Sequence, residues 1–228
     1  MFSTLTALLL GLLQGLRHAF EPDHLAAVST FAAERRSPRA GITLGLAWGL
    51  GHALTLLVAG GALLALRTRM PAHVEDACEL VVAAMLVLLG ARCIARALRE
   101  GGKGAEVHHH HGAGSHVHPT SAPHVHVSRF ALAKRPLLVG LVHGLAGSGA
   151  LAALAVTRIA SVPTGLAFIA VFAAGATLGM ALLTGALGWP LARVARGKKG
   201  LTVLLTSAGI ASTLVGVLVA ARVVGVMG

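Results

Sequence analysis

Six apolar segments account for most of this 228-residue chain. A helix needs about 20 consecutive apolar residues to cross the hydrocarbon core of a bilayer. Only 12% of the residues are charged, whereas a soluble domain has about 25%. The chain is therefore predicted to be all-α, a polytopic transmembrane helix bundle of about six spans. The apolar segments are residues 2–31, 40–66, 77–98, 136–159, 163–194 and 201–226.

A weak internal repeat divides the spans into two halves of three. Gly15-Leu16-Arg17-His18 resembles Gly140-Leu141-Val142-His143. An odd number of spans in each half places the halves in opposite orientation, as in many secondary transporters. Short matches of this kind also arise by chance in apolar chains, so both readings stay open. We predict a first half over residues 1–99, a cytoplasmic loop over 100–130 that is disordered, and a second half over 131–228.

The basic residues predict the orientation in the membrane. The net charge is +11, and the Lys and Arg residues gather in the connections after the first, third and fifth segments. Cytoplasmic loops carry an excess of such residues. We therefore expect a multi-pass protein of the cytoplasmic (inner) membrane with those three connections inside and both termini outside. Because the charge marks topology, the chain is not expected to bind nucleic acid.

The first apolar segment contains a polar cluster, His18, Asp23 and His24. Ionisable groups at membrane depth are costly and usually functional. Two imidazoles and a carboxylate suit a divalent transition metal. On a continuous helix the three side chains would point in different directions. Pro22 is predicted to break the helix, which lets them converge and frees the His18 carbonyl as a further ligand. The alternative is an interfacial helix end, with Arg17 and Glu21 paired at i,i+4 spacing.

Two other histidines lie inside apolar segments and beside glycines. They are His52, in the second segment, and His143, in the fourth. A lone intramembrane histidine often serves only to hydrogen-bond neighbouring helices. Three segments that each carry such a histidine favour a shared metal site, so both residues are predicted to be ligands. Because imidazole must be unprotonated to bind a metal, we expect affinity to fall below a pH of about 6.5.

The predicted loop between the halves is rich in histidine. Gly, Ser, Pro and Val lie between its histidines, so the tract lacks the apolar content needed to fold by itself. Such tracts bind late first-row metals. We predict auxiliary metal capture on the cytoplasmic side, the alternative being a solvated linker without a role. The residues are His108, His109, His110, His111, His116, His118, His124 and His126.

These motifs resemble those of a known family. His18-x4-Asp23-His24, preceded by Arg17, resembles the signature helix of the nickel/cobalt transporters, and Leu50-Gly51-His52-Ala53 resembles their second motif. The stretch from His143 to Ala150 is similar to the urease-accessory membrane proteins of the same superfamily. The resemblance implies Ni²⁺ or Co²⁺ as the transported substrate. It also implies that the signature histidines and Asp23 are essential and that His52 supports them. Family members commonly have eight spans with the signature in the second, whereas here it lies in the first.

We therefore expect a secondary transporter for Ni²⁺ or Co²⁺ in contact with the lipid bilayer. The alternatives are a nickel or cobalt efflux protein and a non-transporting accessory protein. The accessory protein would deliver nickel to maturation proteins of urease or hydrogenase. No catalytic cofactor and no enzymatic activity are expected, since the His-Glu-x-x-His motif of a metalloprotease does not occur.

Overall fold

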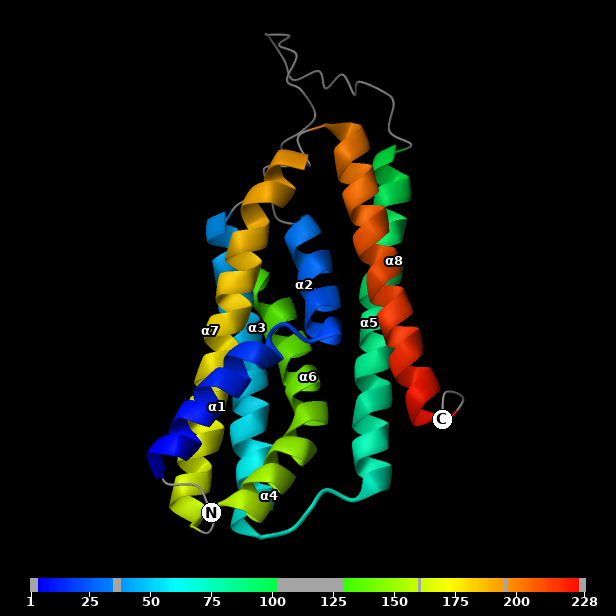
Figure 1. Cartoon of the computed structure of the whole chain (residues 1–228). Coiled ribbons are helices and arrows are strands. Elements are labelled where there is room, and N and C mark those ends of the chain that lie inside the picture. Colours follow the sequence, from blue (N-terminus) through cyan, green and yellow to red (C-terminus); the bar gives the residue numbers. More distant parts are fainter. Residues whose placement is uncertain (1–3, 35–37, 102–128, 160, 195–196, 226–228) are drawn as a thin grey trace, which may run out of the picture.

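The described part of the computed structural model consists of helices and their short connections. Residues 4–34, 38–101, 129–159, 161–194 and 197–225 are described (Figure 1). No strand occurs in these ranges, which confirms the predicted all-α class. The predicted loop histidines, from His108 to His126, lie outside the described residues.

The helices follow the six apolar segments closely. The first segment is divided into two helices at the predicted break, and the second contains a short π-helix, η1, between two α-helical parts. The elements are α1 (Thr4–His18), α2 (Pro22–Glu34), α3 (Pro38–Thr55), η1 (Leu56–Gly60), α4 (Gly61–Ala65), α5 (Ala72–Gly101), α6 (Arg129–Arg158), α7 (Val162–Val194) and α8 (Lys198–Val223).

Four of these helical runs are long and apolar enough to cross a membrane. They cover Arg39–Ala65, Ala72–Glu100, Val162–Leu191 and Lys199–Val223. Large apolar side chains stay exposed along their outer faces, for example Leu88 on α5 and Leu214 on α8. Apolar surface of this extent is unusual for a soluble monomer. The chain is therefore a membrane protein, with the lipid covering these faces.

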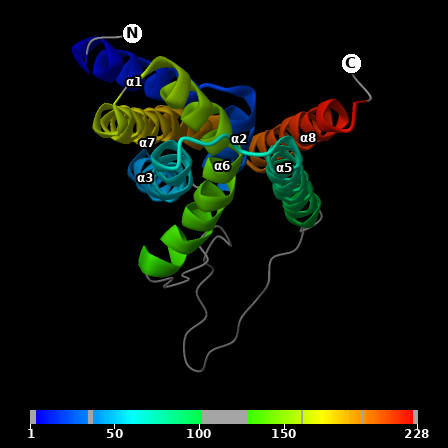
Figure 2. The same cartoon turned by 90° about the horizontal axis from the view of Figure 1, so that it is seen from below.

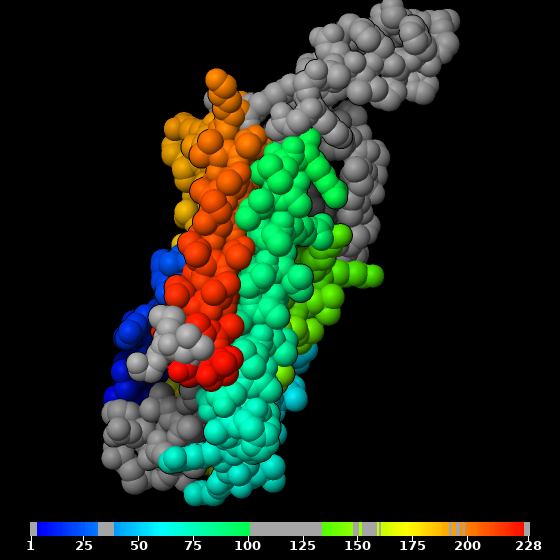
Figure 3. Space-filling model, turned by 90° about the vertical axis from the view of Figure 1, so that its right-hand side faces the viewer, coloured from blue at the N-terminus to red at the C-terminus, as the bar shows by residue number. Residues whose placement is uncertain are grey.

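The bundle has two parts joined through its centre. On one side α7 packs against α1 and α3, and α3 also packs against α6. On the other side α5 and α8 lie along each other, as Figures 2 and 3 show. α2 contacts α8, α7 and α5, and so lies between the two parts. The connection between α1 and α2 lies about half-way along the bundle (Figure 1), with Ala19 buried and Phe20 exposed.

The helices alternate in direction along the chain. α2, α5 and α7 end towards the upper end of the bundle in Figure 1, whereas α1 begins and α8 ends towards the lower end. The last residues of α2, α5 and α7 therefore lie at the same end of the bundle.

Candidate metal centre

The five residues predicted to form a metal site lie together in the structure, although four helices supply them. His18 is the last residue of α1, and Asp23 and His24 are in the first turn of α2. His52 comes from α3 and His143 from α6. The ring centroid of His24 is 4.4 Å from that of His18, 5.4 Å from that of His52 and 4.2 Å from that of His143.

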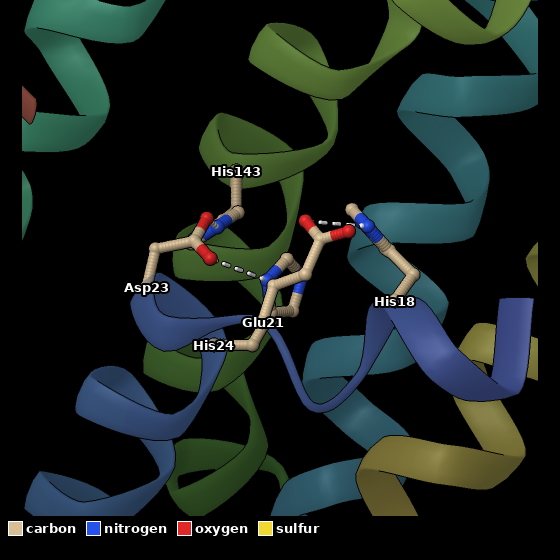
Figure 4. Close-up of polar contacts among 5 residues, drawn as sticks. All are labelled: His18, Glu21, Asp23, His24 and His143. Carbon is tan, nitrogen blue, oxygen red and sulfur yellow. Dashed lines mark hydrogen bonds and ion pairs between the residues drawn. The ribbon is translucent and has the colours of Figure 1, made fainter. Parts of the chain in front are cut away.

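The break before Pro22 makes this arrangement possible. α1 ends at His18 and α2 begins at Pro22, where a proline fits because the first residue of a helix needs no N–H partner. The chain turns between them, so His18 and His24 approach from opposite sides (Figure 4). The prediction that the His18 carbonyl would be free is wrong. It accepts a hydrogen bond from the Glu21 N–H at 3.0 Å. In a continuous helix the donor would be the N–H of residue 22, which proline lacks, and the turn supplies the N–H of Glu21 instead.

Two carboxylates hold three of the imidazoles. Asp23 lies between two helices, with Oδ1 3.2 Å from His24 Nδ1 and Oδ2 2.5 Å from His143 Nε2. Glu21 Oε2 is 3.0 Å from His18 Nδ1. An ionised carboxylate only accepts hydrogen bonds, so each of these ring nitrogens donates. Each neutral ring then has its lone pair on the other nitrogen.

Those other nitrogens are buried and unsatisfied. His18 Nε2, His24 Nε2 and His143 Nδ1 have no hydrogen-bond partner among the described residues, and neither do the two ring nitrogens of His52. The side chains of His24 and His52 are fully buried. A buried polar group without a partner costs about 1–3 kcal/mol. Four histidines with unused nitrogens around one point therefore indicate a site for a ligand that accepts lone pairs.

The donor atoms form two sets that could each hold a metal ion. One contains His18, His24 and His52, and the other contains Asp23, His24 and His143. In each set the ligand atoms lie within 4.8 Å of one another. Donors around a late first-row ion, with bonds of about 2.0–2.1 Å, are at most ~4.2 Å apart. Each set thus needs only a small inward movement to bind.

Sequence reasoning missed three neighbours of the site. Glu21 was weighed only as a partner of Arg17, although its i,i+3 spacing from His18 is a usable signal. The Trp48 ring stacks on His24, with centroids 5.3 Å apart. Thr55 donates to the carbonyl of Leu141 at 2.9 Å and so joins α3 to α6 beside the site. No local pattern indicated the last two contacts, since they depend on how the helices pack.

Comparison with known proteins shows the family of this chain. The family model described as NicO, high-affinity nickel-transport protein, matches residues 4–227, nearly the whole chain. The chain belongs to the NicO family. This NicO-family protein is also 30% identical to the urease accessory protein UreH of Bacillus sp. (strain TB-90) over 213 residues, which cover 93% of this chain and 90% of that protein. No solved structure matches it significantly.

Family membership confirms the resemblance that the motifs indicated. It supports a nickel transport or accessory role for this protein.

Proposed function

We propose that this NicO-family protein is a secondary transporter that carries Ni²⁺, and Co²⁺ as a close analogue, across the cytoplasmic membrane. The ion binds at the break between α1 and α2. The observation that carries the proposal is the convergence of four histidines whose unused ring nitrogens are buried, half-way along a bundle with lipid-facing outer surfaces. Neutral imidazoles suit late first-row ions.

The proposal includes six crossings. α1 and α2 together form the first, as a broken helix of the kind found in transporters. α6 forms the fourth. The connections after α2, α5 and α7 then face the cytoplasm and both termini lie outside. The histidine-rich residues, His108 to His126, would collect metal on the cytoplasmic side.

Matching backbone contacts support the inverted repeat of three plus three spans. α1 packs on α7 as α6 packs on α3. In each of four contacts, a glycine faces a carbonyl oxygen of the neighbouring helix and the amide nitrogen four residues later. The contacts are Gly15 with Phe172 and Ala176, Gly140 with Trp48 and His52, Gly175 with Leu12 and Leu16, and Gly51 with Leu137 and Leu141. In this relation His18 and His143 are equivalent, and the site lies between the two halves.

Transport is tested with the purified chain in vesicles that contain a Ni²⁺-sensitive dye. We expect wild-type vesicles to take up Ni²⁺, and the His18→Ala and Asp23→Ala variants to show at least about a tenfold slower rate while remaining in the membrane. His73→Ala is the matched control, because His73 is an exposed histidine at the start of α5. Wild-type rates in both site variants would overturn the assignment.

The urease accessory relative favours a second candidate, a membrane protein that passes nickel to an enzyme maturation system. Such a protein would bind Ni²⁺ in detergent but would not fill the vesicles. Export is the third possibility. Deletion of residues 104–127 separates it from import, since loss of an importer's capture segment should leave cells short of nickel, whereas loss of an exporter's segment should make them nickel-sensitive.

A further inference from the structure

His24 lies between two groups of metal-binding side chains. In Figure 4, His143 and Asp23 are on one side of the His24 ring and His18 is on the other. We call His18, His24 and His52 the three-histidine set, and Asp23, His24 and His143 the Asp23 set. His24 is the one residue that belongs to both sets.

The two ring nitrogens of His24 face these two sets. Nδ1 is 3.2 Å from the Asp23 carboxylate, whereas Nε2 is buried without a hydrogen-bond partner among the described residues. Nδ1 therefore serves the Asp23 set, and Nε2 serves the three-histidine set. A neutral imidazole has a lone pair on only one nitrogen. His24 can consequently bind a metal in only one set at a time. Electrostatic repulsion between two adjacent divalent ions also disfavours filling both sets at once.

We propose that the site offers one divalent cation two alternative positions that share His24 as a ligand. This inference rests on the proposed function and deepens it. An ion in the three-histidine set is bound only by imidazole nitrogens. An ion in the Asp23 set has a carboxylate oxygen as well. Passage between the two positions releases the ion from one ring nitrogen of His24 and rebinds it at the other, so His24 is a ligand in both positions but not during the transfer.

The protons balance in this step. With the ion in the three-histidine set, His24 Nδ1–H and His143 Nε2–H donate to Asp23, which is the hydrogen bonding that the structure has. When the ion moves to the Asp23 set, the proton of His24 shifts to Nε2 and that of His143 shifts to Nδ1. No proton is gained or lost. The structure thus has the donor arrangement for the three-histidine position.

The test uses Ni²⁺ alone and the purified full-length chain in detergent. In every chain of this test, including the one called wild type below, the eight histidines from His108 to His126 are replaced by alanine, because they are proposed to bind metal themselves. Equilibrium dialysis gives the number of ions bound, and X-ray absorption at the nickel edge gives the ligand types. His52→Asn removes a ligand of the three-histidine set, and His143→Asn removes one of the Asp23 set. His24→Asn removes the shared ligand, and His73→Ala is the control. Asn resembles the part of the histidine side chain nearest the backbone, so it changes the packing little. Size-exclusion profiles check that each variant is folded.

We expect one Ni²⁺ per chain in the wild type, in His73→Ala, in His52→Asn and in His143→Asn. The His143→Asn spectrum should have imidazole nitrogens and no carboxylate oxygen from the protein. The His52→Asn spectrum should contain that oxygen and fewer imidazoles. His24→Asn should bind Ni²⁺ at least about a hundredfold more weakly than the wild type. Loss of a residue that only orients a ligand weakens metal binding by about tenfold to a hundredfold, and His24 is itself a ligand.

Two results would overturn the inference while leaving the proposed function intact. One is two Ni²⁺ ions bound at once by the wild type. The other is a loss of binding in His52→Asn and His143→Asn as large as that in His24→Asn, which would mean a single site that needs all the ligands together. If the folded wild type binds no Ni²⁺, the proposed function fails as well.

Discussion

The contacts of Asp23 could not be predicted from its sequence spacing to His18 and His24. The sequence places it beside His24, and we predicted that it binds metal directly. In the structure its two oxygens lie on His24 and His143, which come from different helices. A carboxylate behind a metal-binding histidine fixes which nitrogen carries the proton. Asp23 therefore orients two imidazoles in this arrangement, and its direct ligation belongs to the second ion position that we propose.

Glu21 has the corresponding relation to His18. Its carboxylate is 3.0 Å from His18 Nδ1, and this hydrogen bond leaves Nε2 available for a metal. We predict that Glu21→Ala weakens Ni²⁺ binding by about tenfold to a hundredfold, the usual effect of losing such a partner. Glu21→Gln should bind more tightly than Glu21→Ala, because its amide oxygen still accepts from the ring. Isothermal titration with Ni²⁺ measures both, in chains whose eight histidines from His108 to His126 are replaced by alanine.

Glu75→Ala is the control for that comparison. Glu75 is an acidic residue in the first turn of α5 and does not belong to either donor set, so its variant changes the net charge equally without touching His18. If Glu21→Ala binds Ni²⁺ as tightly as Glu75→Ala does, Glu21 has no positioning role.

At the scale of the elements, close helix packing depends on glycine. A Cβ added at Gly15 of α1 would collide with the carbonyl oxygen of Phe172 on α7, and this oxygen belongs to the backbone, so a rotamer change cannot move it away. We predict that Gly15→Ala lowers stability by about 1–3 kcal/mol, as overpacking does. A lower thermal unfolding midpoint in detergent is the measurement.

The matched control is Gly197→Ala. A Cβ at Gly197, which precedes α8, would meet nothing within 4 Å. Its backbone is extended, with φ of −100°, which alanine adopts without strain. Equal midpoints for the two variants would contradict the close approach of α1 and α7.

The break in the first apolar segment was predictable because proline acts locally. Pro22 lacks an N–H, and its ring clashes with the preceding turn of a helix. Pro136 in α6 and Pro190 in α7 nevertheless lie inside continuous helices, so the break at Pro22 also depends on its surroundings. The state of the His18 carbonyl was not predictable in the same way. Its hydrogen bond to Glu21 N–H depends on the turn that the chain adopts between α1 and α2. The sequence of this connection is compatible with several turn conformations.

For the whole molecule, the proposed topology makes a direct prediction. Thr68 lies in the exposed connection between α4 and α5, at the opposite end of the bundle from Gly197. In a chain with Cys78 and Cys93 replaced by alanine, a membrane-impermeant maleimide should label Thr68→Cys in intact cells. It should label Gly197→Cys only after the cells are opened. The reverse pattern would place the basic connections outside and refute the orientation.

The sequence by itself determined the helical class, the apolar segments, the position of the break and the residues worth testing as ligands. Hydropathy and proline geometry act over one helix or less, so they can be read along the chain. The tertiary structure alone decided that α3 and α6 bring His52 and His143 to the break, and which ring nitrogens remain unused. Those features depend on contacts between helices distant in the sequence, where side-chain volumes and glycine positions jointly set the approach.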